Sequence, residues 1–282
     1  MEGGGGVDGW TAAPGNGGGQ CCFRTLPDFM FLLHLVGEYC GTIGKQNEEK
    51  EVDKMLYFDW TYSLILIAMV ISMVVQARMQ STFSRYSRVA NGRGLTGREA
   101  ARILLDRQGM YQVQVVPVSG HLSDHYDPRS KTVRLSQDVY NSNSLAALGV
   151  AAHECGHAVQ DARGYVPLKI RGALVPVANF GSQLSWPLFL AGLIFSYRPL
   201  LTAGILLFCG ALLFQLVTLP VELNASRRAL RSLSENGMLY EDEIKGSRKV
   251  LRAAAMTYVA AVITSLLQLL RLLILSNNRR RD

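Results

Sequence analysis

The sequence has few cysteines and no paired cysteine motif. Its five cysteines show no C-x-x-C pair and no spacing typical of a disulfide scaffold, so we expect reduced thiols; they are Cys21, Cys22, Cys40, Cys155 and Cys209. The chain also lacks an internal repeat and a basic motif interleaved with aromatic residues. The net charge of +7 therefore indicates membrane topology and attraction to anionic lipid, and we expect no nucleic-acid partner.

The N-terminal stretch lacks the features of a targeting segment. Residues 1–20 are glycine-rich, contain acidic residues and carry none of the basic and apolar regions of a signal peptide. Arginine is too scarce there for a transit peptide, so the sequence assigns no organelle. We expect residues 1–55 to form a flexible extension.

Uncharged, mostly apolar runs dominate the rest of the chain. Three of them, of 18, 26 and 23 residues, are long enough to cross the hydrocarbon core of a bilayer; they cover residues 60–77, 172–197 and 199–221. A fourth run at residues 253–270 is interrupted by Arg271, so it predicts either a further span or a helix on the membrane surface. The sequence therefore predicts a mainly α, multi-pass membrane protein.

Charge on either side of the first run predicts its orientation. Residues 1–60 contain 4 basic and 9 acidic residues, whereas residues 78–171 contain 13 basic and 7 acidic residues. Residues 221–252 are also basic, by 7 to 5. Because basic loops remain on the cytoplasmic side, we expect both segments to face the cytosol or its equivalent.

The segment "HECGH" at residues 153–157 has the spacing of a metal site. On a helix, His153 and His157 project from the same face one turn apart, and Glu154 lies where its carboxylate can act as general base toward water. The surrounding residues are small or apolar, which favours a buried helix over a solvated one. Helix-capping residues at Asn143 and Ser144 and a stop at Gly164 predict a helix over residues 145–160.

A catalytic zinc needs a third protein ligand, and no histidine follows His157. The third ligand should therefore be a carboxylate, and the downstream candidates are Asp161, Glu222, Glu235, Glu241, Asp242 and Glu243. Glu222 is favoured because a carboxylate at the end of an apolar run, at the membrane boundary, is energetically unfavourable unless it meets a cation. Asp161, one turn beyond His157, is a candidate partner for a histidine ligand.

The region before the zinc motif predicts a small αβ unit. Thr96 and Glu99 form a capping box at the start of a short amphipathic helix within residues 94–110. Residues 113–118 and 131–136 are typical of strands, and an edge strand there could pair with an extended peptide. In the loop between them, either His125 or Tyr126 is a candidate donor to an oxyanion, or these residues only stabilise a tight turn.

Several segments together resemble the YugP-type family of membrane neutral zinc metallopeptidases. They include "GLTGREAARILL", "GHLSDHYDPRSKTVRLS", "VAAHECGHAVQ", "FQLVTLPVELNASRRAL" and "RKVLRAAAMTYVAA". The chain also resembles the heat-shock and prenyl-protein membrane metalloproteases, whose E-x-x-A-D pattern falls on Glu222 and Ala225. Ser226 stands where those relatives carry the aspartate, and Asn224 is a candidate substitute.

The resemblance implies a membrane-embedded zinc endopeptidase with a zincin-like catalytic domain, zinc on His153, His157 and Glu222, and Glu154 as general base. Its substrates would be peptides or membrane proteins in processing or quality control. The alternatives are a zinc-binding pseudoenzyme that acts as a scaffold, and a transporter with Asn179 and Gln183 lining a cavity. The oligomeric state stays open.

The predicted segments follow from these patterns. They are an extension at 1–55, a transmembrane helix at 56–78, a catalytic domain at 79–171, a transmembrane hairpin at 172–221, a basic helical segment at 222–252, a transmembrane or membrane-surface helix at 253–275 and a basic tail at 276–282.

Overall fold

The computed structural model describes residues 60–278. Its elements are, in order, α3 (Tyr62–Tyr86), α4 (Gly97–Arg107), β1 (Gln114–Val118), β2 (His125–Asp127), β3 (Thr132–Ser136), α5 (Gln137–Tyr140), α6 (Leu145–Ala162), α7 (Val166–Ile194), α8 (Arg198–Glu235) and α9 (Glu241–Asn278). The fold is mainly α, as the sequence predicts. The predicted extension at 1–55 and most of the basic tail lie outside the described residues.

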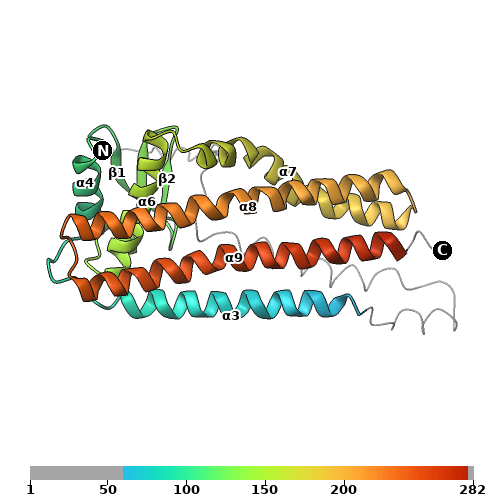
Figure 1. The fold of residues 1–282 in the computed structure, drawn as a ribbon, viewed down its shortest axis with the longest axis horizontal. Helices are drawn as coiled ribbons and strands as arrows, with labels where there is room; N and C mark the ends of the chain where they lie inside the picture. Colours follow the sequence, from blue (N-terminus) through green and yellow to red (C-terminus); the bar gives the residue numbers. More distant parts are fainter. Residues whose placement is uncertain (1–59, 279–282) are drawn as a thin grey trace, which may run out of the picture.

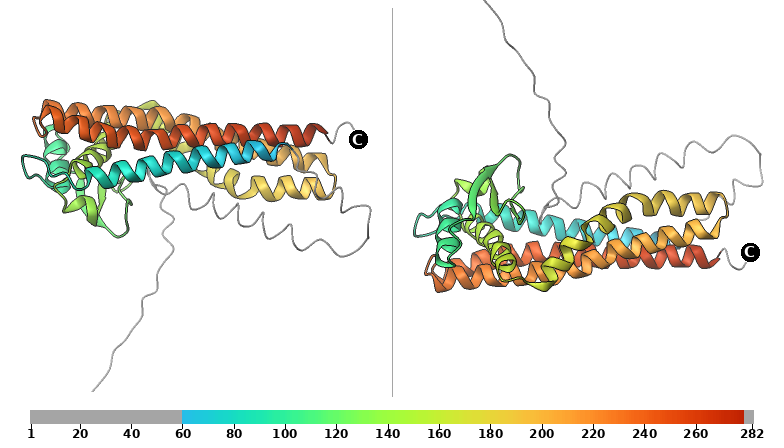
Figure 2. Two further views of the ribbon diagram at one scale, coloured as in Figure 1. Left: turned by 90° about the horizontal axis from the view of Figure 1, so that it is seen from below. Right: turned by 90° about the horizontal axis from the view of Figure 1, so that it is seen from above.

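The long helices lie side by side, and the small elements gather at one end of them (Figure 1). Helices α8 and α9 run along each other, α3 lies along α9, and the second half of α7 returns along α8. Two further orientations in Figure 2 show that α4, α6 and the sheet stay at the same end of the bundle. The turn between α7 and α8 lies at the opposite end.

Within the described residues, α3, α8 and α9 are long and apolar enough to cross a membrane. Many of their large apolar side chains are exposed, as lipid-facing side chains must be. Helix α7 does not reach the same mean hydropathy, although it pairs with α8 as the predicted hairpin. Pro176 and Pro187 lie inside α7, which bends before it joins α8 (Figure 1).

Three glycines allow α7 and α8 to pack closely. A Cβ at Gly181 would lie 2.6 Å from the carbonyl oxygen of Leu207, and one at Gly204 would lie 2.8 Å from that of Ser185. Gly192 meets the backbone of Leu201 in the same way. The hairpin is therefore held by backbone contact along its length, which larger side chains would prevent.

The helix limits differ from the predicted segments in two places. Helix α8 continues without a break from the apolar run through Glu222 to Glu235, and α9 begins at Glu241 and continues past Arg271. The guanidinium of Arg271 lies over the ring of Tyr62, 4.6 Å from its centroid, so the charge is accommodated against α3. Arg271 thus interrupts the apolar run but not the helix.

The αβ unit agrees with the sequence patterns and adds one strand. Thr96 and Glu99 make both hydrogen bonds of the capping box that begins α4. The two expected strands are β1 and β3, which pair in parallel, and β3 is central in the order β1-β3-β2. Strand β2, which pairs antiparallel with β3, was missed because its three residues lie in a segment rich in turn residues.

The main apolar core lies between this unit and the ends of the long helices. Buried residues of α4, α6, β3, α8 and α9 form one cluster. Helix α6 lies at its centre, in contact with α4, α5, α8 and α9 and with the sheet. The helix that carries the zinc motif is therefore fixed from several sides.

The helix order predicts that the sheet and the α7–α8 turn lie on opposite sides of a membrane. A recognition sequence for a site-specific protease, inserted between Arg129 and Ser130 in the exposed β2–β3 turn, should be cut from one face of sealed vesicles. The same sequence between Ser196 and Tyr197 should be cut only from the other face. Cleavage of both variants from one face would contradict this arrangement.

Candidate metal centre

Helix α6 is an interior helix with well-defined ends. Ser144 Oγ accepts a hydrogen bond from the backbone N–H of Ala147 at 3.1 Å, and Gly164 ends the helix with a φ of +63°. Of its 18 residues, 15 are buried, so almost every side chain must fit a neighbouring element. The small residues of the motif region provide that fit.

Gly156, inside the zinc motif, sets how closely α6 approaches α8. A Cβ at this position would lie 2.7 Å from the carbonyl oxygen of Ala225, too close for any other residue without a shift. Glu222 lies three residues before Ala225 on α8, on the same face of that helix. The contact at Gly156 thus brings the carboxylate of Glu222 to the two histidines.

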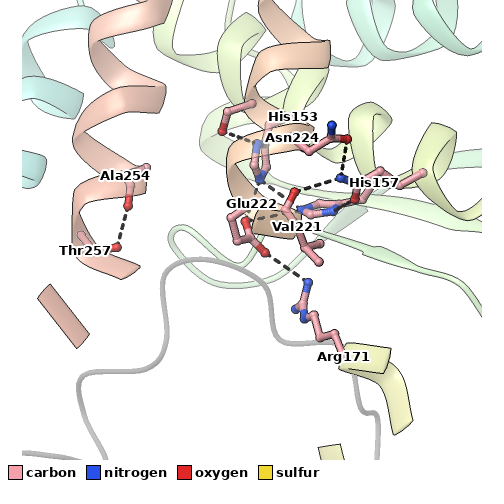
Figure 3. Close-up of polar contacts among 10 residues, drawn as sticks. His153, His157, Arg171, Val221, Glu222, Asn224, Ala254 and Thr257 are labelled. Atoms are coloured by element: carbon pink, nitrogen blue, oxygen red, sulfur yellow. Dashed lines mark hydrogen bonds and ion pairs between the residues drawn. The ribbon is translucent and has the colours of Figure 1, made fainter. Parts of the chain in front are cut away.

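Three ligand atoms converge at this contact (Figure 3). The Nε2 atoms of His153 and His157 are 3.2 Å apart, and Glu222 Oε2 is 3.2 Å from the first and 3.6 Å from the second. Ligands 2.0–2.1 Å from a tetrahedral ion are separated by about 3.3 Å, so these distances fit zinc. All three residues are buried.

Hydrogen bonds orient the ring of His157. The amide nitrogen of Gln160 donates to the carbonyl oxygen of Val221 at 2.9 Å and to Asn224 Oδ1 at 3.0 Å. The amide oxygen of Gln160 therefore faces His157 Nδ1, 3.0 Å away, and accepts its N–H. In that tautomer, Nε2 of His157 has a free lone pair for a metal.

Polar contacts also orient the other two candidate ligands, His153 and Glu222. Ser226 Oγ lies 3.1 Å from His153 Nδ1, on the side of the ring away from the ligand atom. Arg171, at the start of α7, donates from Nη1 to Glu222 Oε1 at 3.1 Å, which leaves Oε2 for the metal. Ser226, which stands where the related proteases carry an aspartate, thus contacts His153, and Asn224 contributes through Gln160.

Glu154 is the most isolated polar group of the site. Its side chain is fully buried, and neither carboxylate oxygen has a hydrogen-bond partner among the described residues. Burial raises the pKa of Glu154 to about 8, while the nearby ring of His153 works in the opposite direction. Burying such a carboxylate without a partner is energetically unfavourable, whereas a cation and a water molecule beside it would stabilise it.

A small cavity lies beside Glu154. It is lined by Val150, His153 and Glu154 of α6, by Glu222 and Ser226 of α8, and by residues of α9. Cys155, although inside the motif, points to α4, where its Sγ lies 3.6 Å from the carbonyl oxygen of Ala101. The donors available to an ion here are therefore imidazole nitrogen and carboxylate oxygen, not thiolate.

The charges also fit a divalent cation. Glu154 and Glu222 are two buried carboxylates, and Arg171 supplies one positive charge beside them. Two imidazole nitrogens and one carboxylate oxygen form a ligand set used by catalytic zinc, which leaves one coordination position for water. The residues present thus fit the zinc ion that the motif predicts.

Other hydrogen bonds engage the loop residues considered at the sequence level. The hydroxyl of Tyr126 donates to Asp161 Oδ2 at 2.8 Å, and Lys131 pairs with the same carboxylate. His125 Nδ1 is 2.8 Å from the carbonyl oxygen of Ser123. Asp161 is therefore not a partner of a histidine ligand, which corrects that expectation, and a role for His125 or Tyr126 toward an oxyanion stays a prediction.

Sequence patterns missed two supporting residues. Gln160 follows His157 by three residues on the same helix face, which is a signal that could have been used. Arg171 precedes an apolar run, where the sequence shows only a charged boundary. Nothing in the sequence places it against a residue 51 positions away.

Comparisons with known proteins agree with this geometry. Residues 61–277 match the family described as "Putative neutral zinc metallopeptidase". The chain is 45% identical over 219 residues to the "Putative membrane protease YugP" of Bacillus subtilis (strain 168), a match that covers 78% of this chain and 97% of that protein. No solved structure matches the chain.

Replacing Gly156 by alanine should weaken zinc binding. The added methyl would force α6 away from Ala225 and move the histidines away from Glu222, so we expect zinc affinity to fall about 10-fold to 100-fold. Competition with a metal chelator measures this. Gly149→Ala is the matched control, because its Cβ would meet Ser247 at an ordinary 3.5 Å. Equal affinities in the two variants would show that the close contact is not needed.

Replacing Gln160 by leucine should also reduce zinc affinity, by about 10-fold to 100-fold, since the buried N–H of His157 would lose its acceptor. The same chelator competition applies, and Gln183→Leu on the exposed face of α7 is the control. If Gln160→Leu binds zinc as tightly as the wild type, Gln160 does not set the orientation of His157.

Proposed function

Because the chain belongs to this neutral zinc metallopeptidase family, we propose that it is a zinc-dependent endopeptidase that hydrolyses peptide bonds of membrane proteins at the membrane surface. One observation carries the proposal: Glu154 is fully buried beside three converging metal ligands, and neither of its oxygens has a hydrogen-bond partner within residues 60–278. A structural zinc site needs four protein ligands and no such carboxylate.

His153, His157 and Glu222 would hold the zinc, which polarises a scissile carbonyl and activates water when bound. Glu154 then takes a proton from the attacking water as the new C–O bond forms. It passes that proton to the amide nitrogen as the C–N bond breaks, so its carboxylate is regenerated. Gln160 and Ser226 hold the imidazoles in place throughout, and Arg171 keeps Glu222 from turning both oxygens toward the ion.

The position of Glu222 supports a membrane-protein substrate. It follows directly on the apolar run at residues 199–221, which at 1.5 Å per residue is about 35 Å long and thus long enough to cross the hydrocarbon core. The scissile bond would therefore lie near the boundary of the bilayer. Processing or quality control of membrane proteins needs cleavage at this level.

The catalytic side would face the cytosol or its equivalent. The segments that form the site, residues 78–171 and 221–252, are the basic ones, and basic loops are retained on that side. The chain would then be a multi-pass membrane protein with its αβ unit on the cytosolic face. Anionic lipid would attract the same surface.

Glu154→Gln tests the enzymatic role. The variant should retain zinc, because Glu154 is not a ligand, but peptide hydrolysis should fall by about 10²-fold to 10⁴-fold with the loss of the general base. The measurement is casein cleavage by the purified full-length chain, with zinc content determined in the same samples. Glu241→Gln, at the exposed start of α9, is the control and should cleave like the wild type.

Two further results test the substrate class and separate an enzyme from a scaffold. A segment of casein can be anchored to vesicles that contain the chain by adding a single apolar helix to it. If membrane proteins are the substrates, this anchored segment should be cut faster than the free segment. If the zinc-loaded wild type cuts neither form, and Glu154→Gln still supports the chain's function in cells, the chain is a zinc-binding scaffold.

A further inference from the structure

Helix α7 carries two polar side chains on the face that points away from its partner α8. Gly181 and Ser185 mark the opposite face of α7, which lies in close backbone contact with α8. Asn179 and Gln183 are each two residues from Gly181, which is about 200° around the helix axis. Both side chains are exposed, and among residues 60–278 neither amide makes a hydrogen bond.

The contacts with α8 place these two amides deep in the candidate membrane region. Where α7 returns along α8 (Figure 1), Gly181 lies beside Leu207, well inside the apolar run at residues 199–221. The nearest charged residues of α8 are Arg198 and Glu222, at least about 13 Å from Leu207 along the helix at 1.5 Å per residue. In hydrocarbon, an amide at this level lacks water as a hydrogen-bond partner, which is unfavourable unless another partner replaces it.

The same face of α7 has the residue spacing of a helix–helix interface. Its positions recur alternately every four and three residues, the pattern by which one helix packs along another. All of them are exposed except Trp186, which is half-buried; they are Gly172, Pro176, Asn179, Gln183, Trp186 and Leu190. We call these six positions the α7 outer face. A Cβ at Gly172 would meet nothing within 4 Å, so among the described helices none packs against this glycine.

Pro187 leaves a further acceptor at the level of Gln183. Because proline has no N–H, the carbonyl oxygen of Gln183, four residues earlier, lacks the donor that a regular helix would provide. Both the side chain and the backbone of Gln183 therefore offer hydrogen bonds inside the apolar region. A second helix at this level could use them.

We propose that the α7 outer face binds the same face of a second copy of this chain. Copies of a membrane protein insert with the same orientation, so a two-fold axis along the membrane normal brings each residue of α7 to its own counterpart at equal depth. A side-chain amide contains both donor N–H groups and an acceptor oxygen, so Asn179 and Gln183 can each exchange hydrogen bonds with their counterparts. An unrelated helix would need a matching polar group at each of these two depths.

The two amides differ in this respect from the hydroxyls of the same hairpin. Ser182 and Thr202 are exposed as well, but Ser182 Oγ donates to the carbonyl oxygen of Asn179 and Thr202 Oγ1 to that of Arg198, both at 3.1 Å. These hydroxyls are satisfied within their own helices. Since lipid is as apolar as a leucine side chain, interhelical hydrogen bonds and close packing drive helix association in a bilayer, and the amides supply such bonds.

Energy transfer between copies in a bilayer tests the interface. The full-length chain, labelled after Asp282 with a donor or an acceptor fluorophore, is reconstituted into phosphatidylcholine vesicles over a range of protein-to-lipid ratios. The transfer efficiency then gives a dimer dissociation constant. We expect a dimer for the wild type, and Asn179→Leu/Gln183→Leu should raise the dissociation constant at least about 10-fold, because leucine makes none of the amide hydrogen bonds.

Thr202→Leu is the matched control for the double variant. It also replaces an exposed polar side chain of the hairpin by leucine, but the hydroxyl that it removes is bonded within α8. This variant should dimerise like the wild type. Zinc content should be equal in all three proteins, because the α7 outer face contains no metal ligand.

A photoreactive phenylalanine in place of Leu190 identifies the partner in native membranes. Leu190 is exposed on the α7 outer face, and irradiation should give a product that contains two copies of this chain. The same photoreactive residue in place of Leu184, which is exposed on another face of α7, should give no such product.

Three results would overturn the proposal. They are wild-type energy transfer no greater than chance proximity gives, an unchanged dissociation constant in the double variant, and a cross-link from position 190 to a different protein in place of a second copy. The last result would mean that the α7 outer face binds another helix, such as that of a membrane-protein substrate.

Discussion

The whole site depends on the contact of α6 with α8 at Gly156 and Ala225. Only a residue without a side chain allows the two backbones to come this close, and the approach brings Glu222 within 3.2 Å of His153 Nε2. Two buried carboxylates then lie together in the interior, balanced by a single arginine. A cation at the three ligands relieves an arrangement that burial alone would make unfavourable.

The long helices determine where the α6–α8 contact would lie relative to a membrane. Helix α8 carries an apolar run and then, without a break, the carboxylate ligand and Ser226, so a candidate membrane span and the metal ligand lie on one continuous helix. Helix α7 contributes Arg171 from its first turns before it bends and returns along α8. The hairpin therefore supplies both the carboxylate ligand and the arginine that orients it.

Local patterns predicted much of this arrangement. The spacing of His153 and His157, the capping box of α4 and the apolar runs all depend on residues close in sequence, and its position at the end of an apolar run singled out Glu222 among the acids that follow His157. Gln160 and Arg171 were not predicted, because their roles depend on which helices meet in space. Strand β2 is too short for an alternating pattern, and only the fold shows that Arg271 of α9 contacts Tyr62 of α3.

The most direct test of the metal centre is X-ray absorption at the zinc edge on the zinc-loaded, full-length chain in detergent. We expect a first shell of nitrogen and oxygen atoms at about 2.0–2.1 Å, with the outer-shell scattering of two imidazoles and no sulfur. A sulfur atom at about 2.3 Å would mean that a cysteine binds the ion, and scattering from fewer than two imidazoles would mean that His153 and His157 do not share it. Either result would contradict a zinc site built from His153, His157 and Glu222.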